Sequence, residues 1–552
     1  MSTLKTDEHG GVRLVRSAAL IVGWLLAGAA APAPRPAYDI VIRGGRVLDG
    51  AGNPWISADV AIRNGRIARV GVIQAAGRKE IDARGRYVSP GFIDMLDQSG
   101  RALPRDGSAA SKLRMGVTTL IAGEGGTAVP AGELAGYFTA LERQGIAVNF
   151  GTYYGAFQAR VKVMGDGAGA PSEAQLRAME DEVRTAMRAG AFGISSALIY
   201  SPASFQSTGD LARLAAIPGK CGGFYATHMR DESDKLLAAI DEAVAISERS
   251  GAKLEIFHIK AAYAPLWGRL MPQAIARIEA ARARRVDVGA NIYPYRAGGT
   301  GLDVTIPTHV FAKGREAAHA ALRDPKVRAQ LKKELAAGPQ ADWSNLVHAS
   351  GGWKNVVLAN AQNEQYRRFH GKSFAEIGKA LGKDPADAAW DIWLGALPAR
   401  AGALYFMMDD RDIDLAMKQP WVSVGTDAAA SDSTAAAETM GRPHPRAYGT
   451  FPRIIAEYVV SRGVLTLPDA IRKMTSLPAQ RLGLADRGLL REGMRADLVV
   501  FDLAKIEDRA TYDDPTAAPS GIDSVIVNGV EAVANGQVTG SRSGAVLRHS
   551  CR

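Results

Sequence analysis

The feature that most constrains the fold is a helix-like segment followed by a strand-like segment, an order that recurs along the middle of the chain. Residues 172–190 begin with a capping box of Ser172 and Gln175 and end at Gly190, and the strand-like run "AFGISSALIY" follows. The helix-like "DESDKLLAAIDEAVAISERSG" likewise precedes "AKLEIFHIK", and "MPQAIARIEAARARR" precedes "VDVGANIYPY". Strands joined by helical crossovers lie parallel in one sheet. Over several hundred residues, this order predicts an α/β fold closed into a (β/α)8, TIM-like barrel.

Both ends of the chain have a different, β-rich pattern. Short runs of valine and isoleucine, punctuated by Gly-Gly, Asn-Gly and Arg-Gly, occupy residues 38–88, and the same texture returns in residues 485–545. We expect these two pieces to pair into one small β-sandwich domain, which leaves residues 89–484 for the barrel. Residues from about 305 to 402 interrupt the helix–strand order, so they are predicted to form an inserted subdomain.

The first 31 residues have the form of a signal peptide. Arg13 and Arg16 precede an apolar stretch that ends in small residues with Ala-x-Ala spacing, and "PAPRP" follows. The stretch is shorter than the roughly 20 residues that a membrane span needs, which argues against an uncleaved anchor. We therefore expect cleavage near Ala29 to Ala31, a periplasmic or secreted protein, and no stable membrane span after processing.

Cysteine content and charge limit the kinds of ligand that this protein is expected to bind. Only Cys221 and Cys551 are present, and Cys551 is the second-last residue, so neither a disulfide framework nor a cysteine-rich zinc site is expected. Residues 1–31 carry three basic and two acidic side chains, so the net charge of +10 becomes +9 without them. The basic residues are dispersed without interleaved aromatics, which indicates a solvated surface rather than a nucleic-acid groove. A small-molecule partner is expected, and assembly into a homo-oligomer stays open.

Candidate chemistry lies at the ends of strand-like runs, where barrels of this kind carry their reactive groups. Glu124 follows "TTLIAG", His228 follows "GGFYAT", His258 follows "KLEIF" and Asp427 follows "WVSVGT". Two imidazoles and one carboxylate can hold Zn²⁺ and leave its fourth position for water, and a second carboxylate can take the water's proton. One histidine at a strand end is more often structural, but four residues of the right types favour a hydrolytic site.

The sequence also resembles a known family, through motifs in a fixed order. These are "YDIVIRGGRVLDGAG", "SPGFID", "GVTT", "YATHMRDE", "YPY", "SVGTD", "HPRAYGTFPR", "KMTSLPAQRLGL" and "GLLREGMRADLVVFD". From about Tyr38 to Gly540 the chain resembles the amidohydrolase superfamily, and within it the D-aminoacylases, or N-acyl-D-amino-acid deacylases. The resemblance implies a β-sandwich and a metal-bearing barrel, with His228 and His258 as ligands and Asp427 as the catalytic acid and base.

The chain departs from this family at two metal-binding motifs. Relatives usually carry His-x-His after "GFID", where this chain has Leu96 and Gln98, and the D-aminoacylases carry a cysteine ligand after "GVTT", where it has Glu124. Leucine cannot bind a metal and a neutral glutamine binds poorly, so the more exposed of the family's two metal positions should stay empty. We expect one Zn²⁺ per chain, bound by Glu124, His228 and His258. The superfamily's amino-sugar-phosphate deacetylases also use one Glu and two His, so catalysis is expected to persist.

Substrate-binding residues are less sharply indicated. Tyr293 and Tyr295 match a family segment that lines the substrate site, although aromatic packing would explain them equally well. Four arginines near the motifs could bind a carboxylate through a forked pair of hydrogen bonds: Arg230, Arg296, Arg442 and Arg446. Arg230 and Arg296 are nearest the motifs, so these two are predicted to bind substrate. Lys260 is interpreted as structural, because a carboxylated lysine usually bridges two metals.

The sequence therefore predicts an exported, zinc-dependent amidohydrolase that acts on C–N bonds other than ordinary peptide bonds. The expected reaction is deacylation of an N-acyl-D-amino acid by a metal-bound water, with Asp427 as base and then acid. Two alternatives stay open. One is a hydrolase of another amide, such as a D-residue dipeptide or a cyclic amide. The other is a catalytically impaired binding protein of the same fold, motivated by the missing His-x-His, although the presence of Asp427 argues against it.

Overall fold

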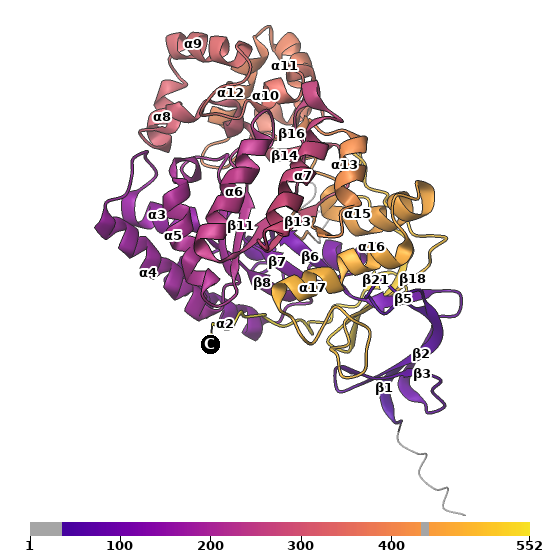
Figure 1. The fold of residues 1–552 in the computed structure, drawn as a ribbon. Coiled ribbons are helices and arrows are strands. Elements are labelled where there is room, and N and C mark those ends of the chain that lie inside the picture. Colours follow the sequence, from indigo (N-terminus) through magenta and orange to yellow (C-terminus); the bar gives the residue numbers. More distant parts are fainter. Residues whose placement is uncertain (1–35, 432–440, 552) are drawn as a thin grey trace, which may run out of the picture. The chain divides into compact units, whose positions relative to one another are not determined.

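Two parallel sheets form the middle of the chain in the computed structural model, which describes residues 36–431 and 441–551 (Figure 1). One sheet has the order β17-β13-β12-β11-β10-β9 and the other has the order β6-β7-β8. The backbone N–H of Phe192 donates to the carbonyl of Thr152 (3.0 Å), and a parallel bridge pairs Asp97 with Ala428, so contacts join the sheets at both edges. The strands of the two sheets are β6 (Phe92–Asp97), β7 (Val117–Ala122), β8 (Asn149–Thr152), β9 (Tyr154–Gly155), β10 (Gly193–Ala197), β11 (Phe224–His228), β12 (Lys253–Ile256), β13 (Val288–Ile292) and β17 (Val422–Val424).

Helices cover these strands, and every residue of β7, β10, β11 and β13 is buried. Helix α5 contacts β10 and β11, helix α6 contacts β11 and β12, and helix α7 contacts β13. Burial on both faces explains the continuous apolar runs of the sequence. The helices that alternate with or follow the strands are α1 (Ala110–Arg114), α2 (Leu134–Gln144), α3 (Ala156–Met164), α4 (Glu173–Ala189), α5 (Thr208–Gly219), α6 (Leu236–Ser250), α7 (Leu270–Ala283), α13 (Asp410–Met417), α15 (Arg446–Arg453), α16 (Leu467–Met474) and α17 (Ser476–Leu482).

Helix α4 begins and ends where its sequence predicts. The Ser172 hydroxyl accepts a hydrogen bond from the backbone N–H of Gln175 (3.2 Å), and the Gln175 side chain accepts one from the backbone N–H of Ser172 (2.8 Å). Gly190 ends the helix with a φ of +108°, a conformation that strains residues with a Cβ. The predicted capping box and glycine stop are therefore confirmed, as is the mixed α/β architecture.

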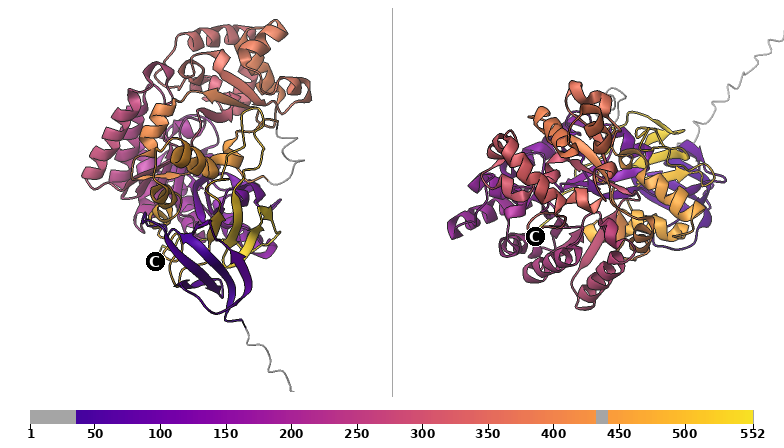
Figure 2. Two further views of the ribbon diagram at one scale, coloured as in Figure 1. Left: turned by 90° about the vertical axis from the view of Figure 1, so that its right-hand side faces the viewer. Right: turned by 90° about the horizontal axis from the view of Figure 1, so that it is seen from above.

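The β-rich ends of the chain lie in one nine-stranded sheet of the described residues, in which indigo and yellow strands are neighbours (Figure 2). Strands β5 and β18 are its junction, with Ser89 opposite Val499. Asp497 connects this sheet to the parallel strands, because its carboxylate accepts hydrogen bonds from Arg487 (2.6 Å) and Asn149 (3.0 Å). The strands are β1 (Tyr38–Val47), β2 (Ile56–Arg63), β3 (Arg66–Gly71), β4 (Gly77–Asp82), β5 (Tyr87–Pro90), β18 (Leu498–Phe501), β19 (Ile522–Val527), β20 (Val530–Ala534) and β21 (Gln537–Val538).

The segment that interrupts the helix–strand order contains an antiparallel sheet of order β14-β16-β15. Figure 1 shows helices α8 to α12 grouped together above β14 and β16. Trp343 and Trp390 are buried within this segment, which gives it apolar packing of its own. Its elements are β14 (Ala297–Gly301), α8 (Arg315–Ala321), α9 (Pro325–Ala336), α10 (Leu346–Ala349), β15 (Val356–Asn360), α11 (Phe374–Leu381), α12 (Pro385–Gly395) and β16 (Gly402–Phe406).

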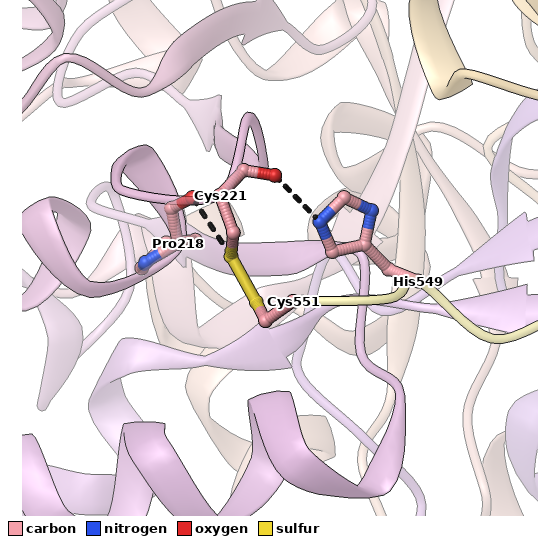
Figure 3. Close-up of a disulfide and its surroundings, with 4 residues drawn as sticks. All are labelled: Pro218, Cys221, His549 and Cys551. Carbon is pink, nitrogen blue, oxygen red and sulfur yellow. Dashed lines mark hydrogen bonds between the residues drawn. A yellow bond between two sulfur atoms is a disulfide. The ribbon is translucent and has the colours of Figure 1, made fainter.

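The two cysteines form a single disulfide, a bond that the sequence did not predict (Figure 3). The C-terminal tail runs beside β8, where the N–H of Phe150 donates to Ala545 (2.9 Å) and the N–H of Leu547 donates to Phe150 (2.7 Å). A ring nitrogen of His549 then lies 3.1 Å from the carbonyl oxygen of Cys221. These contacts bring Cys551 to a partner 330 positions earlier, a separation that sequence alone could not relate.

Among the helices of residues 36–431 and 441–551, none combines the length and the hydrophobicity that a membrane crossing requires. The predicted signal peptide, residues 1–31, lies outside the described residues.

Candidate active site

Four residues predicted from strand ends meet in one cavity of about 310 Å³. Glu124 lies two residues beyond β7, and His228 is the last residue of β11. His258 lies two residues beyond β12, and Asp427 lies three residues beyond β17. The carboxyl ends of parallel strands meet at one edge of a sheet, which is why residues so far apart in sequence share a cavity.

Glu124 and the two histidines form a buried cluster of ligand atoms. The Glu124 Oε1 atom lies 2.8 Å from Nδ1 of His228 and 2.9 Å from Nε2 of His258. The two imidazole rings cross edge to face with centroids 4.5 Å apart. One carboxylate oxygen and two imidazole nitrogens converging from three strands are a ligand set suited to Zn²⁺.

Glu232 lies on the opposite side of the same two histidines. Its carboxylate is 3.4 Å from Nε2 of His228 and 3.1 Å from Nδ1 of His258, the ring nitrogens that face away from Glu124. Lys260 forms an ion pair with the same carboxylate at 2.8 Å. Such a partner fixes the orientation of a ligating histidine. Glu232 was missed by the sequence reasoning, although the "HMRDE" motif contains it.

Glu124 and His258 favour each other's charged form. Burial opposes a charged Glu124, but His258 and His228 outweigh it and hold the pKa of this carboxyl well below its ordinary value. Burial and Lys260 lower the pKa of His258, whereas Glu232 and Glu124 outweigh them and raise it to about 9. A cation that binds here competes with the His258 proton, so its affinity rises with pH.

Asp427 faces this cluster from the end of β17 with a strained backbone. Its φ is +48°, and its N–H donates to the carbonyl of Leu96 (2.8 Å). Its carboxylate accepts a hydrogen bond from the Gln98 amide (3.2 Å) and lies 2.8 Å from Nη1 of Arg446. Burial raises the pKa of Asp427, and Arg446 opposes this rise. Gln98 also donates to Glu124, so this one amide joins the two carboxylates.

Comparisons with known proteins assign the chain to a family. Residues 412–533 match the model of the amidohydrolase family. N-acyl-D-glutamate deacylase of Alcaligenes xylosoxydans xylosoxydans is 34% identical, over 92% of this chain and 96% of the relative. D-aminoacylase of the same organism is 32% identical, over 92% of this chain and 97% of the relative. The chain belongs to the D-aminoacylase family of amidohydrolases.

A solved structure of this family supports the same assignment. N-acyl-D-glutamate deacylase from Bordetella bronchiseptica, complexed with zinc and a phosphonate inhibitor that mimics the tetrahedral intermediate, is 29% identical, covers 93% of this chain and 99% of its own, and has a TM-score of 0.75. The chain therefore has the amidohydrolase fold. Leu96 and Gln98, which are predicted to stand where relatives usually carry His-x-His, both contact Asp427, Leu96 through its backbone carbonyl and Gln98 through its side-chain amide.

A fully buried charge network lies beneath Asp427. The Lys112 ammonium is 2.9 Å from both Asp94 and Asp97 and donates to the Thr426 hydroxyl at 2.5 Å. Asp94 in turn accepts the backbone N–H of Thr426 at 2.9 Å. The two aspartates belong to β6, so the network ties this strand to the residue directly before Asp427.

Replacing Lys112 with Met is expected to lower the free energy of unfolding by about 3–5 kcal/mol, because two buried carboxylates lose their counter-charge. Urea denaturation followed by circular dichroism measures the change. Lys162→Met is the matched control, since Lys162 is 55% exposed and pairs with Glu182 on the surface. The control should lose less than about 1 kcal/mol. Equal losses in the two variants would contradict the proposed contribution of the network.

Three residues predicted to bind substrate, Tyr295, Arg230 and Arg296, do not line this cavity. The Tyr295 hydroxyl donates to Asp508 (2.7 Å). The Arg230 guanidinium binds Glu242 through two nitrogens, each at 2.9 Å, and so holds helix α6. The Arg296 side chain is 56% exposed. Of the predicted substrate-binding set, Tyr293 alone lies against the cavity.

Arg446 lines the cavity, although Arg230 and Arg296 were the arginines predicted to bind substrate. Its side chain is buried, and its Nε and Nη1 atoms lack a hydrogen-bond partner of good geometry among the described residues. Its guanidinium lies 4.6 Å from the centre of the Tyr293 ring. Lys260 also lines the cavity, whereas Arg442 pairs with Asp513 elsewhere (3.2 Å).

Proposed function

We propose that this protein is a metal-dependent hydrolase that removes the acyl group from N-acyl-D-amino acids. The observation that carries the proposal is the convergence of Glu124, His228, His258 and Asp427 in one cavity. The names of the two relatives, N-acyl-D-glutamate deacylase and D-aminoacylase, supply the substrate class.

The residues present fit a single zinc ion. Glu124, His228 and His258 would hold it, since their ligand atoms lie within 4.8 Å of one another and Glu232 orients both rings from behind. When bound, the ion polarises a carbonyl and lowers the pKa of a coordinated water to about 7. Gln98 donates to Glu124 and Asp427 at the place of the absent His-x-His pair, which supports one ion per chain.

Asp427 is the residue that moves the proton. Its carboxylate lines the cavity and is held by Gln98 and Arg446, so it can accept a proton from the attacking water. The same carboxyl then donates this proton to the nitrogen of the leaving amine as the amide bond breaks. One group thus serves as base and acid, and the proton balance closes within the reaction.

Arg446 is the proposed anchor for the substrate carboxylate. A buried guanidinium with unsatisfied donors is costly unless an anionic ligand completes its hydrogen bonds. Tyr293 packs against this guanidinium and lines the same cavity, so we place it beside the bound substrate.

We also infer that the two parallel sheets are one closed (β/α)8 barrel, with residues 38–88 and 485–545 as its β-sandwich domain and residues from about 305 to 402 as an insertion. The contacts between Phe192 and Thr152 and between Asp97 and Ala428, one at each seam, support closure.

Export to the periplasm or medium is a further proposal. The Cys221–Cys551 disulfide supports it, because disulfides persist mainly in oxidising compartments. The N-terminus of protein isolated from the native cell should lie near Ala29 to Ala31. An intact Met1 or Ser2 would contradict export by cleavage.

The proposed reaction is tested with a chiral panel. Purified protein of known metal content is assayed for amine release from N-acetyl-D- and N-acetyl-L-amino acids, D-residue dipeptides and cyclic amides. Release from N-acetyl-D-amino acids, abolished by a chelator and restored by Zn²⁺, is the expected outcome. Preference for L substrates, for dipeptides or for cyclic amides would replace the proposal, and no turnover of any amide would favour a binding protein.

A further inference from the structure

A second cavity, of about 150 Å³, adjoins the cavity of the reaction site. Ile199, Tyr200 and Arg400 line both, so these three side chains form the boundary between them. The Tyr200 ring lies 5.3 Å from the ring of His228, which places the boundary directly against the candidate metal ligands. We call the second cavity the distal chamber and these three residues its gate.

Arg400, the charged residue among the three gate residues, is already paired with a carboxylate. Arg400 binds Asp303 through two nitrogens, at 2.9 and 3.1 Å, in the forked geometry that arginine and carboxylate prefer. Arg400 also donates to the Thr300 hydroxyl (3.3 Å) and lies 5.1 Å from the centre of the Tyr200 ring. A Cβ at Gly301 would collide with both Arg400 and Asp303, so this residue leaves room for the pair.

Beyond the gate, the walls are mainly apolar and come largely from the inserted segment. Trp343 and Trp393 are 6% and 5% exposed, and Trp393 packs edge to face against Phe311 and against His319. The apolar wall comprises Val304, Ile306, Phe311, Trp343, Trp393 and Leu397. Charged groups at the wall are the Asp303–Arg400 pair and, farther along the inserted segment, the solvent-exposed Arg315. His319 also lines the wall, and burial, with Arg315 and Arg323 nearby, lowers the pKa of its imidazole.

The reaction cavity itself offers no spare cation for a second carboxylate. Three lysine and arginine side chains line it in the described residues, and each has a carboxylate partner: Lys260 with Glu232, Arg400 with Asp303, and Arg446 with Asp427. Arg446 retains free donors, and the proposed function assigns these to the α-carboxylate. A short acidic side chain would therefore reach the gate without a free counter-charge.

We infer, on the basis of the proposed function, that the distal chamber binds an uncharged, apolar arm of the substrate. The enzyme is thus selective for N-acyl-D-amino acids with neutral side chains over those of D-glutamate and D-aspartate, although one of its relatives is an N-acyl-D-glutamate deacylase. Both the acyl chain and the amino-acid side chain of a substrate can be the uncharged, apolar arm. The experiment determines which of the two the distal chamber binds.

The experiment measures kcat/KM of the zinc-loaded protein on a grid of substrates. The side chain is varied among D-Leu, D-Phe, D-Gln, D-Glu and D-Asp, and the acyl group among acetyl, hexanoyl and phenylacetyl. We expect D-Leu or D-Phe to exceed D-Glu by about tenfold or more, the range that apolar pockets achieve. A gain with longer acyl groups at a fixed side chain assigns the chamber to the acyl arm, and a gain with larger side chains at fixed acetyl assigns it to the side-chain arm.

Asp303→Asn tests the gate, because it frees the Arg400 charge. The ratio of D-Glu to D-Leu activity should rise up to about fivefold, the size expected for a partly exposed ion pair. Asp414→Asn is the matched control, since Asp414 also pairs with an arginine, Arg462, is equally exposed at 22%, and lines neither cavity. The control should keep the wild-type ratio. An unchanged ratio in Asp303→Asn, or wild-type preference for acidic substrates, would overturn the inference.

Binding gives a readout that does not depend on turnover. Tryptophan fluorescence of zinc-loaded Asp427→Asn is titrated with N-acetyl-D-Leu, N-phenylacetyl-D-Leu and N-acetyl-D-Glu, because Trp343 and Trp393 line the chamber. Tighter binding of the apolar ligands, with quenching that Trp343→Phe reduces, supports the inference. If these ligands bind this way and the wild type hydrolyses none of them, the proposed function fails while the chamber assignment stands. Equal or tighter binding of the acidic ligand contradicts the chamber assignment itself.

Discussion

Asp427→Asn is expected to lower kcat by at least roughly 10² to 10⁴, the range typical of lost general acid–base catalysis. Asparagine keeps the shape of the side chain and one acceptor oxygen, so it can keep one of the two contacts that the Asp427 oxygens make with Gln98 and Arg446. What it removes is the group that accepts a proton from water and returns it to the leaving amine. The measurement is steady-state amine release from the best substrate of the chiral panel, compared with the wild type.

Two controls separate lost proton transfer from collateral damage. Zinc content of Asp427→Asn should stay close to that of the wild type, because Asp427 is not among the three clustered ligands. Asp508→Asn alters another buried carboxylate, one that binds Tyr295 outside the cavity, and should retain most activity. Wild-type kcat in Asp427→Asn would remove this residue from the mechanism, and a large loss of zinc would reassign it as a ligand.

The convergence of the catalytic candidates could be predicted from sequence because strand ends in a parallel sheet share one edge. Glu124, His228 and His258 each follow a buried apolar run, so the fold class alone placed them together. The helix boundaries of α4 could be predicted for a local reason, since Ser172 and Gly190 supply the hydrogen bonds and the backbone conformation that its ends need. These signals can be read from a few neighbouring residues or from one repeating pattern of apolar positions.

The substrate-binding residues could not be predicted in this way. Beyond the end of a strand, no regular alternation fixes the direction in which a side chain points. Arg230 and Glu232 are both close to His228 in sequence, yet their side chains bind different partners. Arg230 binds Glu242 on helix α6, whereas Glu232 returns to the two histidines. Arg446 reaches the cavity from helix α15, and Cys551 reaches Cys221 through a tail that pairs with β8. Such contacts are set by tertiary packing between distant segments.

Metal analysis of ligand variants should show a single zinc per chain that depends on Glu124, His228 and His258. A carboxylate, two neutral imidazoles and a water complete a tetrahedral count. Glu124→Ala and His258→Ala are expected to lose bound zinc on dialysis, because each removes an atom of the three-residue set. Glu232→Gln should keep the ion but bind it about 10- to 100-fold more weakly, as the loss of an orienting partner does. Two tightly held ions in the wild type, or full retention in both alanine variants, would show that this ligand set is wrong.

Leu96 and Gln98, predicted to stand in place of a His-x-His pair, allow the opposite experiment. Leu96 is apolar and 1% exposed, and the Gln98 amide donates to both Glu124 and Asp427, so a second dication there would meet no imidazole and would repel the first ion. Leu96→His/Gln98→His supplies two imidazoles, one of them in place of the amide that donates to the Glu124 carboxylate. Zinc content of this double variant should rise from one to two per chain, measured by elemental analysis after gel filtration. Leu96→Asn/Gln98→Asn, with polar but poorly ligating side chains, should stay at one. A double histidine variant that still binds one ion would show that these two side chains do not control the second position, and the explanation for a single ion would have to come from Glu124 itself.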